Sequence, residues 1–295
     1  MNYFTIKQNY YAGDFTQSLQ EISKFNKVSD DTLVFYKSQS EIELGQFEPQ
    51  STSTPLEQAF AAYFEFLQTR DLSKLSNQIS KETSSPFELY VLASAEAILG
   101  QFEESLMTCV QGIDSDEMVG TSELLLLAVQ VALLNGQAST AQTMLENYNA
   151  ANEDSISSDD EIIISLAESY VKFATNQETA RSNFYFFEEL SQTFPTWKTQ
   201  LGLMNVHLQL GNLPEAQTIL ETLESDYYSV EQKQVAQKYR QHLLANKISL
   251  FIAQGSDDVD ELRQQLAQEA PENSYTKQHK EATAKFDEVV AKYSS

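Results

Sequence analysis

Cysteine, glycine and proline are scarce in this chain of 295 residues, and no long hydrophobic run is present. The single cysteine, Cys109, excludes a disulfide within the chain and fits a reducing compartment. The most apolar stretch, Leu124 to Leu134, is interrupted by Gln130 and has about half the length of a membrane span. The start, MNYFTIKQNYYAGDF, lacks the features of a signal peptide. The sequence therefore predicts a cytosolic protein.

Positive charge is also scarce. The chain has 19 Lys and Arg against 43 Asp and Glu, which gives a formal net charge of −24 at pH 7. This charge repels nucleic acid and anionic lipid. We therefore expect no direct binding to nucleic acid or insertion into membranes, and a partner with a basic surface is favoured.

Catalytic motifs are missing as well. The three histidines, His207, His242 and His279, lie far apart and lack metal-binding spacing. The two nearest glycines, Gly112 and Gly120, are too far apart for a dinucleotide or phosphate loop, and no Gly-x-Ser-x-Gly motif occurs. Cys109 lies in an apolar stripe and is predicted to be a core residue. The sequence predicts no enzyme, no cofactor and no metal site.

What is present is a repeat marked by glycine. Five of the nine glycines begin similar phrases, namely GDFTQSL from Gly13, GQFEPQ from Gly45, GQFEESL from Gly100, GQASTAQ from Gly136 and GNLPEAQ from Gly211. In each phrase, glycine is followed by a small polar residue, and in most of them by Phe or Leu and a nearby Ser or Ala. This pattern predicts a left-handed glycine that ends one helix, followed by the cap of a second helix.

The segments around these glycines have helical periodicity. After Gly100, apolar or small residues fall on one stripe, at Phe102, Ser105, Leu106, Cys109, Val110 and Ile113. First helices precede the glycines, as in PFELYVLASAEAILG and SELLLLAVQVALLNG. The small residue in the second helix is predicted to let it approach the first closely.

The spacing of the glycines indicates the class of repeat. Gly13 and Gly45 are 32 residues apart, and Gly100 and Gly136 are 36 apart. The 75 residues from Gly136 to Gly211 leave room for two units, one without a glycine. A period near 34 in helix-turn-helix units is typical of tetratricopeptide repeats, which stack into a curved solenoid.

We therefore predict an all-α, tetratricopeptide-like α-solenoid over residues 1–295, curled into a ring or bracelet. Residues 1–225 would hold five to six repeats, with an insertion around 46–83 that contains a loop at 48–55 and a short helix at 71–81. Residues 226–295 would close the solenoid with a long helix and two further helices, Asp257–Gln268 and Ser274–Tyr293.

Two rare residues, Trp197 and His207, are interpreted as structural. Trp197 is predicted to pack against the preceding repeat, and His207 to be packed or half-buried. The stretch SISSDDE has two interpretations, a solvated acidic loop or a phosphorylation site at Ser157 or Ser158.

A partner-binding groove is predicted where first helices face the inside of the solenoid. Counting back from each turn, the groove residues are Tyr90, Ser94, Leu126, Gln130, Leu133, Lys172, Leu201, Asn205 and Leu208. This groove is largely apolar and has one lysine, which suits a folded or hairpin partner. The alternative is a tetratricopeptide adaptor or co-chaperone that captures peptide segments, although such grooves normally hold a carboxylate with several basic and Asn side chains.

Several blocks of the sequence resemble one family. YFTIKQNYYAGDF, ELLLLAVQVALLNG, NFYFFEELSQTFPTWKTQLGL and SDYYSVEQK are similar to the epsilon subunits of coatomer, the COPI vesicle coat, in their fungal form. The likeness runs from Tyr3 to the final KFDEVVAKY, and the FPTWKTQLGL block is its most specific part.

The resemblance implies a non-enzymatic solenoid that closes like a bracelet around a β-hairpin from the C-terminal region of the coatomer alpha subunit. It implies a structural subunit that stabilises the alpha subunit and supports transport from Golgi to endoplasmic reticulum and within the Golgi. It further implies a cytosolic protein that reaches the cytosolic face of Golgi membranes and COPI vesicles through the rest of coatomer, with no small-molecule substrate.

Overall fold

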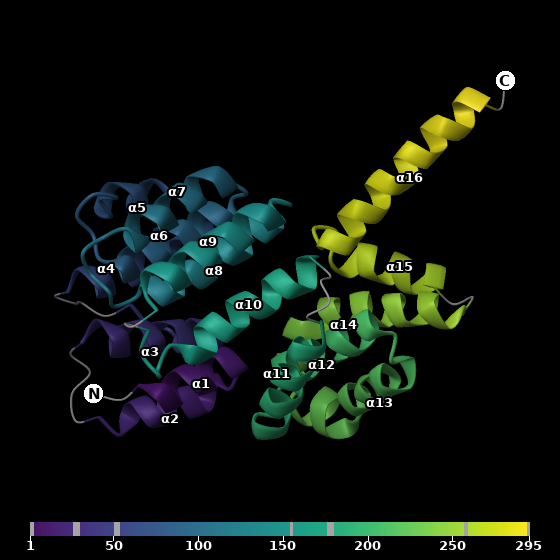
Figure 1. Cartoon of the computed structure of the whole chain (residues 1–295), viewed down its shortest axis with the longest axis horizontal. Helices are drawn as coiled ribbons and strands as arrows, with labels where there is room; N and C mark the ends of the chain where they lie inside the picture. The colour runs from purple at the N-terminus through teal and green to yellow at the C-terminus, as the bar shows by residue number, and fades with distance from the viewer. Residues whose placement is uncertain are drawn as a thin grey trace. The chain divides into compact units, whose positions relative to one another are not determined.

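A computed structural model describes residues 3–25, 30–49, 54–153, 156–175, 180–256 and 259–293 (Figure 1). The regular structure of these residues is entirely helical, which confirms the all-α prediction and fits an α-solenoid of helical repeats. The chain divides into two compact units, unit 1 with residues 1–179 and unit 2 with residues 180–295. The single solenoid and the closed ring stay predictions.

Unit 1 consists of helices that pack mainly against their neighbours in the sequence. Its helices are α1 (Phe4–Ala12), α2 (Phe15–Ser23), α3 (Asp31–Glu43), α4 (Pro55–Thr69), α5 (Ser73–Gln78), α6 (Pro86–Ile98), α7 (Phe102–Ile113), α8 (Thr121–Leu134), α9 (Ala138–Ala151) and α10 (Glu161–Thr175). The predicted pairs α1–α2, α6–α7 and α8–α9 are all present.

Unit 2 begins with helices that pack on their neighbours as in unit 1, and ends with helices that do not follow the repeat. Its helices are α11 (Ala180–Thr193), α12 (Trp197–Leu210), α13 (Leu213–Glu224), the π-helix η1 (Tyr227–Glu231), α14 (Lys233–Gln254), α15 (Val259–Glu269) and α16 (Ser274–Tyr293). The two predicted C-terminal helices are present as α15 and α16, with residues 257–258 outside the described residues. That they close the solenoid stays a prediction. The predicted long helix is α14, and the π-helix η1 precedes it.

The glycine turns are confirmed. All five glycines of the repeated phrase have positive φ, for example 88° at Gly13 and 75° at Gly211. After Gly13 the amide of Asp14 donates to the carbonyl of Asn9 at 2.8 Å, which satisfies a carbonyl at the end of α1. A residue with a β-carbon is disfavoured in this conformation, which explains why glycine recurs there.

The small residue of each second helix also behaves as predicted. The hydroxyl of Ser105 in α7 donates to the carbonyl of Ala93 in α6 at 2.7 Å, and Ser18 makes the same kind of bond to Ile6 at 3.3 Å. Ala141 and Ala216 occupy the equivalent place and are fully buried. Small side chains therefore allow the two helices of each pair to approach closely.

The predicted insertion contains the expected short helix, α5, whose Leu75 is fully buried. Residues 50–53 of the predicted loop lie outside the described residues. The helix after the loop, α4, begins at Pro55 because Thr54 and Glu57 form a reciprocal capping box.

The inner helices of unit 1 form a continuous cycle of contacts. Helix α1 packs on α3, and contacts continue through α4, α6, α8 and α10, which in turn lies against α1. Figure 1 shows α10 running beside α1 and α8, although the chain separates α1 from α10 by most of unit 1. Unit 1 is therefore closed on itself.

A buried ionic network joins this cycle. Lys7 Nζ of α1 lies 3.0 Å from Glu123 Oε1 of α8 and also pairs with Asp160, directly before α10. The hydroxyl of Tyr36 in α3 donates to Glu123 Oε1 at 2.5 Å. Burial alone would lower the pKa of Lys7, but the carboxylates of Glu123 and Asp160 raise it above its usual value.

The core of unit 2 is apolar and aromatic. Trp197 is 2% exposed, its ring stacks on Tyr239 with centroids 6.4 Å apart, and it meets Tyr228 edge-on at 5.7 Å. These partners follow Trp197 in the chain, so the prediction that it packs against the preceding repeat is wrong. The tandem pattern could not show this, because the π-helix that carries Tyr228 lies outside the repeat.

Candidate partner-binding surface

The first two predicted groove residues lie one turn apart on α6. Tyr90 is half-buried, meets Phe35 edge-on with ring centroids 5.0 Å apart, and is hydrogen-bonded to Ser94. Burial raises the pKa of the Tyr90 phenol, so its hydroxyl is neutral at physiological pH. A half-buried tyrosine presents an apolar ring together with a polar group, as interface residues often do.

The next three residues lie on α8, which packs on α6 and α10. Leu126 is only 5% exposed and belongs to the core, whereas Gln130 and Leu133 are half-buried. Gln130 is hydrogen-bonded to the hydroxyl of Tyr170 in α10. This bond connects the two helices at the predicted surface and fixes the Gln130 amide.

The only cation of the predicted groove is Lys172 on α10. It is half-buried, and its Nζ lies 3.4 Å from Glu168 Oε2, one turn earlier on the same helix. The lysine charge is therefore balanced locally. Together, the accessible residues on these helices form what we call the α6–α8–α10 face, namely Tyr90, Ser94, Gln130, Leu133 and Lys172.

The three predicted groove residues of unit 2 differ in accessibility. Leu201 is 6% exposed and belongs to the Trp197 core, and Leu208 packs against that core. Asn205 is exposed. Leu201 and Leu208 thus stabilise unit 2, and a role for the three residues in partner binding stays a prediction.

Unit 2 also has a cleft that sequence reasoning missed. The cleft has a volume of about 550 Å³, its wall includes Trp197, Leu243 and Leu262, and three cations of α14 line it, namely Lys233, Arg240 and Lys247. These cations lie seven residues apart and so share one side of the helix. That spacing, in a chain with few cations, was the signal available in the sequence. Two of them are paired, Arg240 with Glu269 and Lys247 with Glu224.

Other residues with chemical potential have structural roles. His207 is 7% exposed, lies 5.5 Å from Phe184 between ring centroids, and has its pKa lowered by burial, which confirms a packed imidazole. Cys109 is fully buried, which confirms its core position and raises its pKa. Ser157 and Ser158 are exposed, and their phosphorylation stays a prediction.

The described part of the chain has neither a metal-ligating cluster nor a membrane-spanning helix. No group of three or more His, Cys, Asp or Glu side chains there is placed to hold a metal ion. Likewise, no described helix is both long and apolar enough to cross a membrane.

Two comparisons with known proteins point to the same family over nearly the whole chain. The model of the coatomer epsilon subunit family matches residues 2–294. Coatomer subunit epsilon of Saccharomyces cerevisiae (strain ATCC 204508 / S288c) is 56% identical over 293 residues, which cover 99% of each chain. The chain therefore belongs to the coatomer epsilon subunit family, whose members are structural components of the COPI vesicle coat.

Proposed function

We propose that this chain is a non-catalytic component of coatomer that binds and stabilises the C-terminal domain of the alpha subunit. In this role it supports vesicle transport from Golgi to endoplasmic reticulum and within the Golgi. It acts in the cytosol and reaches the cytosolic face of Golgi membranes and COPI vesicles through the other coatomer subunits.

The observation that supports this proposal is the composition of the α6–α8–α10 face. Its half-buried Tyr90, Gln130 and Leu133 offer an apolar surface with a few fixed polar groups. Such a surface suits a folded segment or β-hairpin, whose exposed backbone groups need hydrogen-bond partners. Its only lysine is balanced by Glu168, which makes the face a poor site for an acidic peptide tail and disfavours the adaptor alternative.

The test is co-expression of the full chain with the C-terminal domain of the alpha subunit, followed by gel filtration. We expect one peak that contains both proteins. Leu133→Asp should abolish co-elution, because it places a charge in the face. The matched control is Leu134→Asp, since Leu134 is 62% exposed and lies beside Leu133 on the same helix.

Two outcomes would count against the proposal. Separate elution of the unmodified proteins at micromolar concentration contradicts binding itself. Equal co-elution of both leucine variants, with unchanged helical circular dichroism, would show that the α6–α8–α10 face is not the contact. Leu208→Asp is unsuitable as a test, because Leu208 packs on the core of unit 2 and its loss would affect folding.

A further inference from the structure

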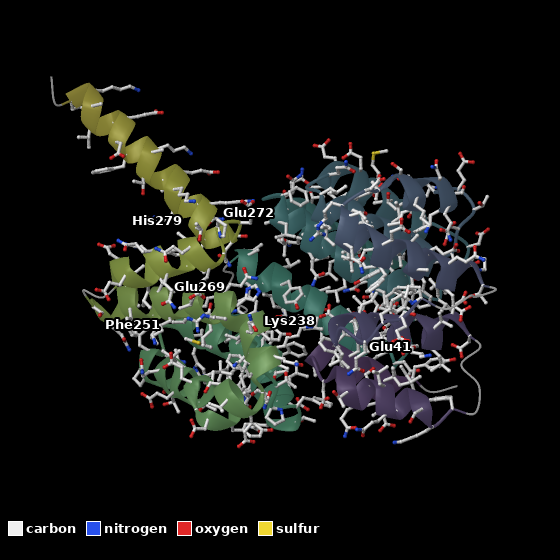
Figure 2. The ribbon with its side chains drawn as sticks, turned by 180° about the vertical axis from the view of Figure 1, so that it is seen from behind. Glu41, Lys238, Phe251, Glu269, Glu272 and His279 are labelled. Carbon is white, nitrogen blue, oxygen red and sulfur yellow. The ribbon has the colours of Figure 1, made fainter. Side chains whose placement is uncertain are left out.

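The last helix of the chain is attached to unit 2 only at its base. In its first turn Thr276 is buried, and the hydroxyl of Tyr275 accepts a hydrogen bond from Arg263 of α15 at 3.1 Å. All residues from 281 to 293 are exposed. Figure 2 shows His279 near the base of α16, beyond which the helix runs away from α14 and α15. About two thirds of α16 is thus exposed.

This exposed part carries large apolar side chains on one side. Phe286 is 68% exposed, Val289 50%, Val290 43% and Tyr293 85%. With the residues before them they form a single stripe, which we call the α16 stripe, namely Tyr275, His279, Ala282, Phe286, Val289, Val290 and Tyr293. Apart from Val290, which follows Val289 directly, its members are separated by alternating four- and three-residue steps. Steps of this kind are typical of a helix that packs along another helix.

The charges beside the α16 stripe are unevenly distributed. Lys285 and Lys292 border one side of the stripe, seven residues apart, whereas Thr283 and Asp287 border the other. The glutamates Glu281 and Glu288 lie further round the helix, each four residues before a lysine, where they favour the helix itself. The border that carries Lys285 and Lys292 is therefore basic, in a chain whose net charge is −24.

We propose that the α16 stripe is a docking surface for an amphipathic helix from elsewhere in coatomer, one that carries Asp or Glu beside its own apolar stripe. The apolar residues of the two helices would interlock, and the carboxylates would lie opposite Lys285 and Lys292. This inference rests on the proposed function only in placing the partner within coatomer, and it describes a surface separate from the α6–α8–α10 face.

Two other occupants fit the charges less well. A second copy paired antiparallel would bring the lysine borders together. A parallel copy would place the two lysines opposite Thr283 and Val290, on a side that offers only one carboxylate, Asp287, for the two lysines. An anionic membrane would attract the lysines but repel the rest of the chain, whose excess of acidic residues is large. A carboxylate-bordered helix satisfies both the apolar stripe and its basic border.

The direct test replaces Phe286 with the photo-cross-linker p-benzoylphenylalanine in the full chain, expressed in cells that contain coatomer. We expect an adduct with another protein of the coatomer complex, and mass spectrometry should map it to a helix rich in Asp and Glu. The matched control places the same residue at Ala284, on the opposite side of α16, where we expect no adduct.

The other results of the cross-linking experiment would overturn the inference. These are an adduct of two copies of this chain, an adduct with lipid, or no adduct from Phe286. Failure of the proposed function alone gives a different pattern. In that case the chain elutes apart from the C-terminal domain of the alpha subunit in gel filtration, while Phe286 still cross-links to a different coatomer protein.

Substitutions test the two parts of the surface separately. Phe286→Asp with Val290→Asp should reduce recovery of the cross-linked protein with the tagged chain by roughly tenfold or more, as expected for loss of a central apolar anchor. The control pair, Ala284→Asp with Ala291→Asp, should leave recovery unchanged. Lys285→Glu with Lys292→Glu should also reduce recovery, with a dependence on salt that the apolar variant lacks. Equal recovery of all variants would contradict the proposal.

Discussion

The centres of the two units are stabilised by different interactions. In unit 1, Lys7, Glu123 and Tyr36 form a buried polar network between helices that are distant in the sequence. In unit 2, Trp197 and the leucines around it form an apolar core. Unit 1 is closed on itself by contacts between α1 and α10, whereas unit 2 ends in a helix whose apolar stripe is exposed.

This difference indicates how a repeat protein can separate stability from binding. A buried ion pair contributes little net stability but strongly disfavours arrangements that leave either charge without a partner, so it fits a role in fixing how α1 meets α8. An apolar core tolerates more variation in its boundary. Unit 2 can therefore keep a stable core while α16 remains available for another protein.

The largest effect is expected for Glu123→Ala in unit 1. It removes the carboxylate that Lys7 and Tyr36 share, and leaves a buried ammonium group with only Asp160. We expect the free energy of unfolding to fall by about 3–5 kcal/mol, as for other broken buried ion pairs. Urea denaturation followed by circular dichroism measures this.

The matched control for this prediction is Glu65→Ala. Glu65 pairs with Lys74 at 2.5 Å, but both side chains are more than half exposed. Exposed pairs contribute roughly 0–1 kcal/mol, so little change is expected. Equal effects of the two variants would show that the buried network is not what stabilises the centre of unit 1.

Adding one methyl group to a closely packed glycine compares the rigidity of the two cores. A β-carbon at Gly202 in unit 2 would lie 2.2 Å from the ring of Phe187, and one at Gly112 in unit 1 would lie 2.4 Å from the end of the Leu124 side chain. A buried ring moves aside less readily than the end of a leucine side chain. We therefore expect Gly202→Ala to lower the free energy of unfolding by about 1–3 kcal/mol, and Gly112→Ala to lower it less. Thermal unfolding of both variants checks this order. A larger loss of stability in Gly112→Ala than in Gly202→Ala would contradict the prediction.

Lower pH should destabilise unit 2 through protonation of His207. Burial lowers the pKa of this imidazole, against the opposing charges of Glu215 and Glu188. Its contribution to stability is therefore present above the unfolded pKa, about 6.5, and is lost as the pH falls through the lower folded value. Trp197 is the only tryptophan and lies in unit 2, so its fluorescence during urea unfolding reports this change.

The control for this prediction is His207→Phe, which keeps a ring beside Phe184 and cannot titrate. It should show less loss of stability between pH 8 and pH 5.5 than the unmodified chain. Parallel losses in both proteins would show that protonation of His207 does not contribute.

The smallest effect is expected when the chain is ended after Lys280. This change removes the exposed part of α16, residues 281–293. Surface changes of this kind usually alter the free energy of unfolding by less than about 0.5 kcal/mol. A marked loss of stability in urea denaturation would show that α16 is part of the fold, and not a surface that awaits a partner.

Local features of this fold could be predicted from the sequence. The glycine turns at Gly13 and Gly211, the small Ser105 and the bounds of α16 all follow from periodicity and backbone preference, which act over a few residues. The buried position of Cys109 follows from its place in an apolar stripe.

Features that depend on distant contacts could not be predicted. Lys7 and Glu123 are more than a hundred residues apart, and nothing in either local pattern indicates that they meet. The same holds for Trp197, whose ring partners lie on η1 and α14. At the candidate surface, periodicity placed the predicted residues on helices but did not separate the buried Leu126 and Leu201 from the accessible Gln130, because both kinds of position lie near the same helical face.

The central claim, that this chain clasps one partner in the coat, is tested most directly by native mass spectrometry of the full chain co-expressed with the C-terminal domain of the alpha subunit. The account predicts one species with the mass of a one-to-one complex, and its loss in Leu133→Asp but not in Leu134→Asp. Two free proteins at micromolar concentration, or a complex indifferent to Leu133, would contradict it.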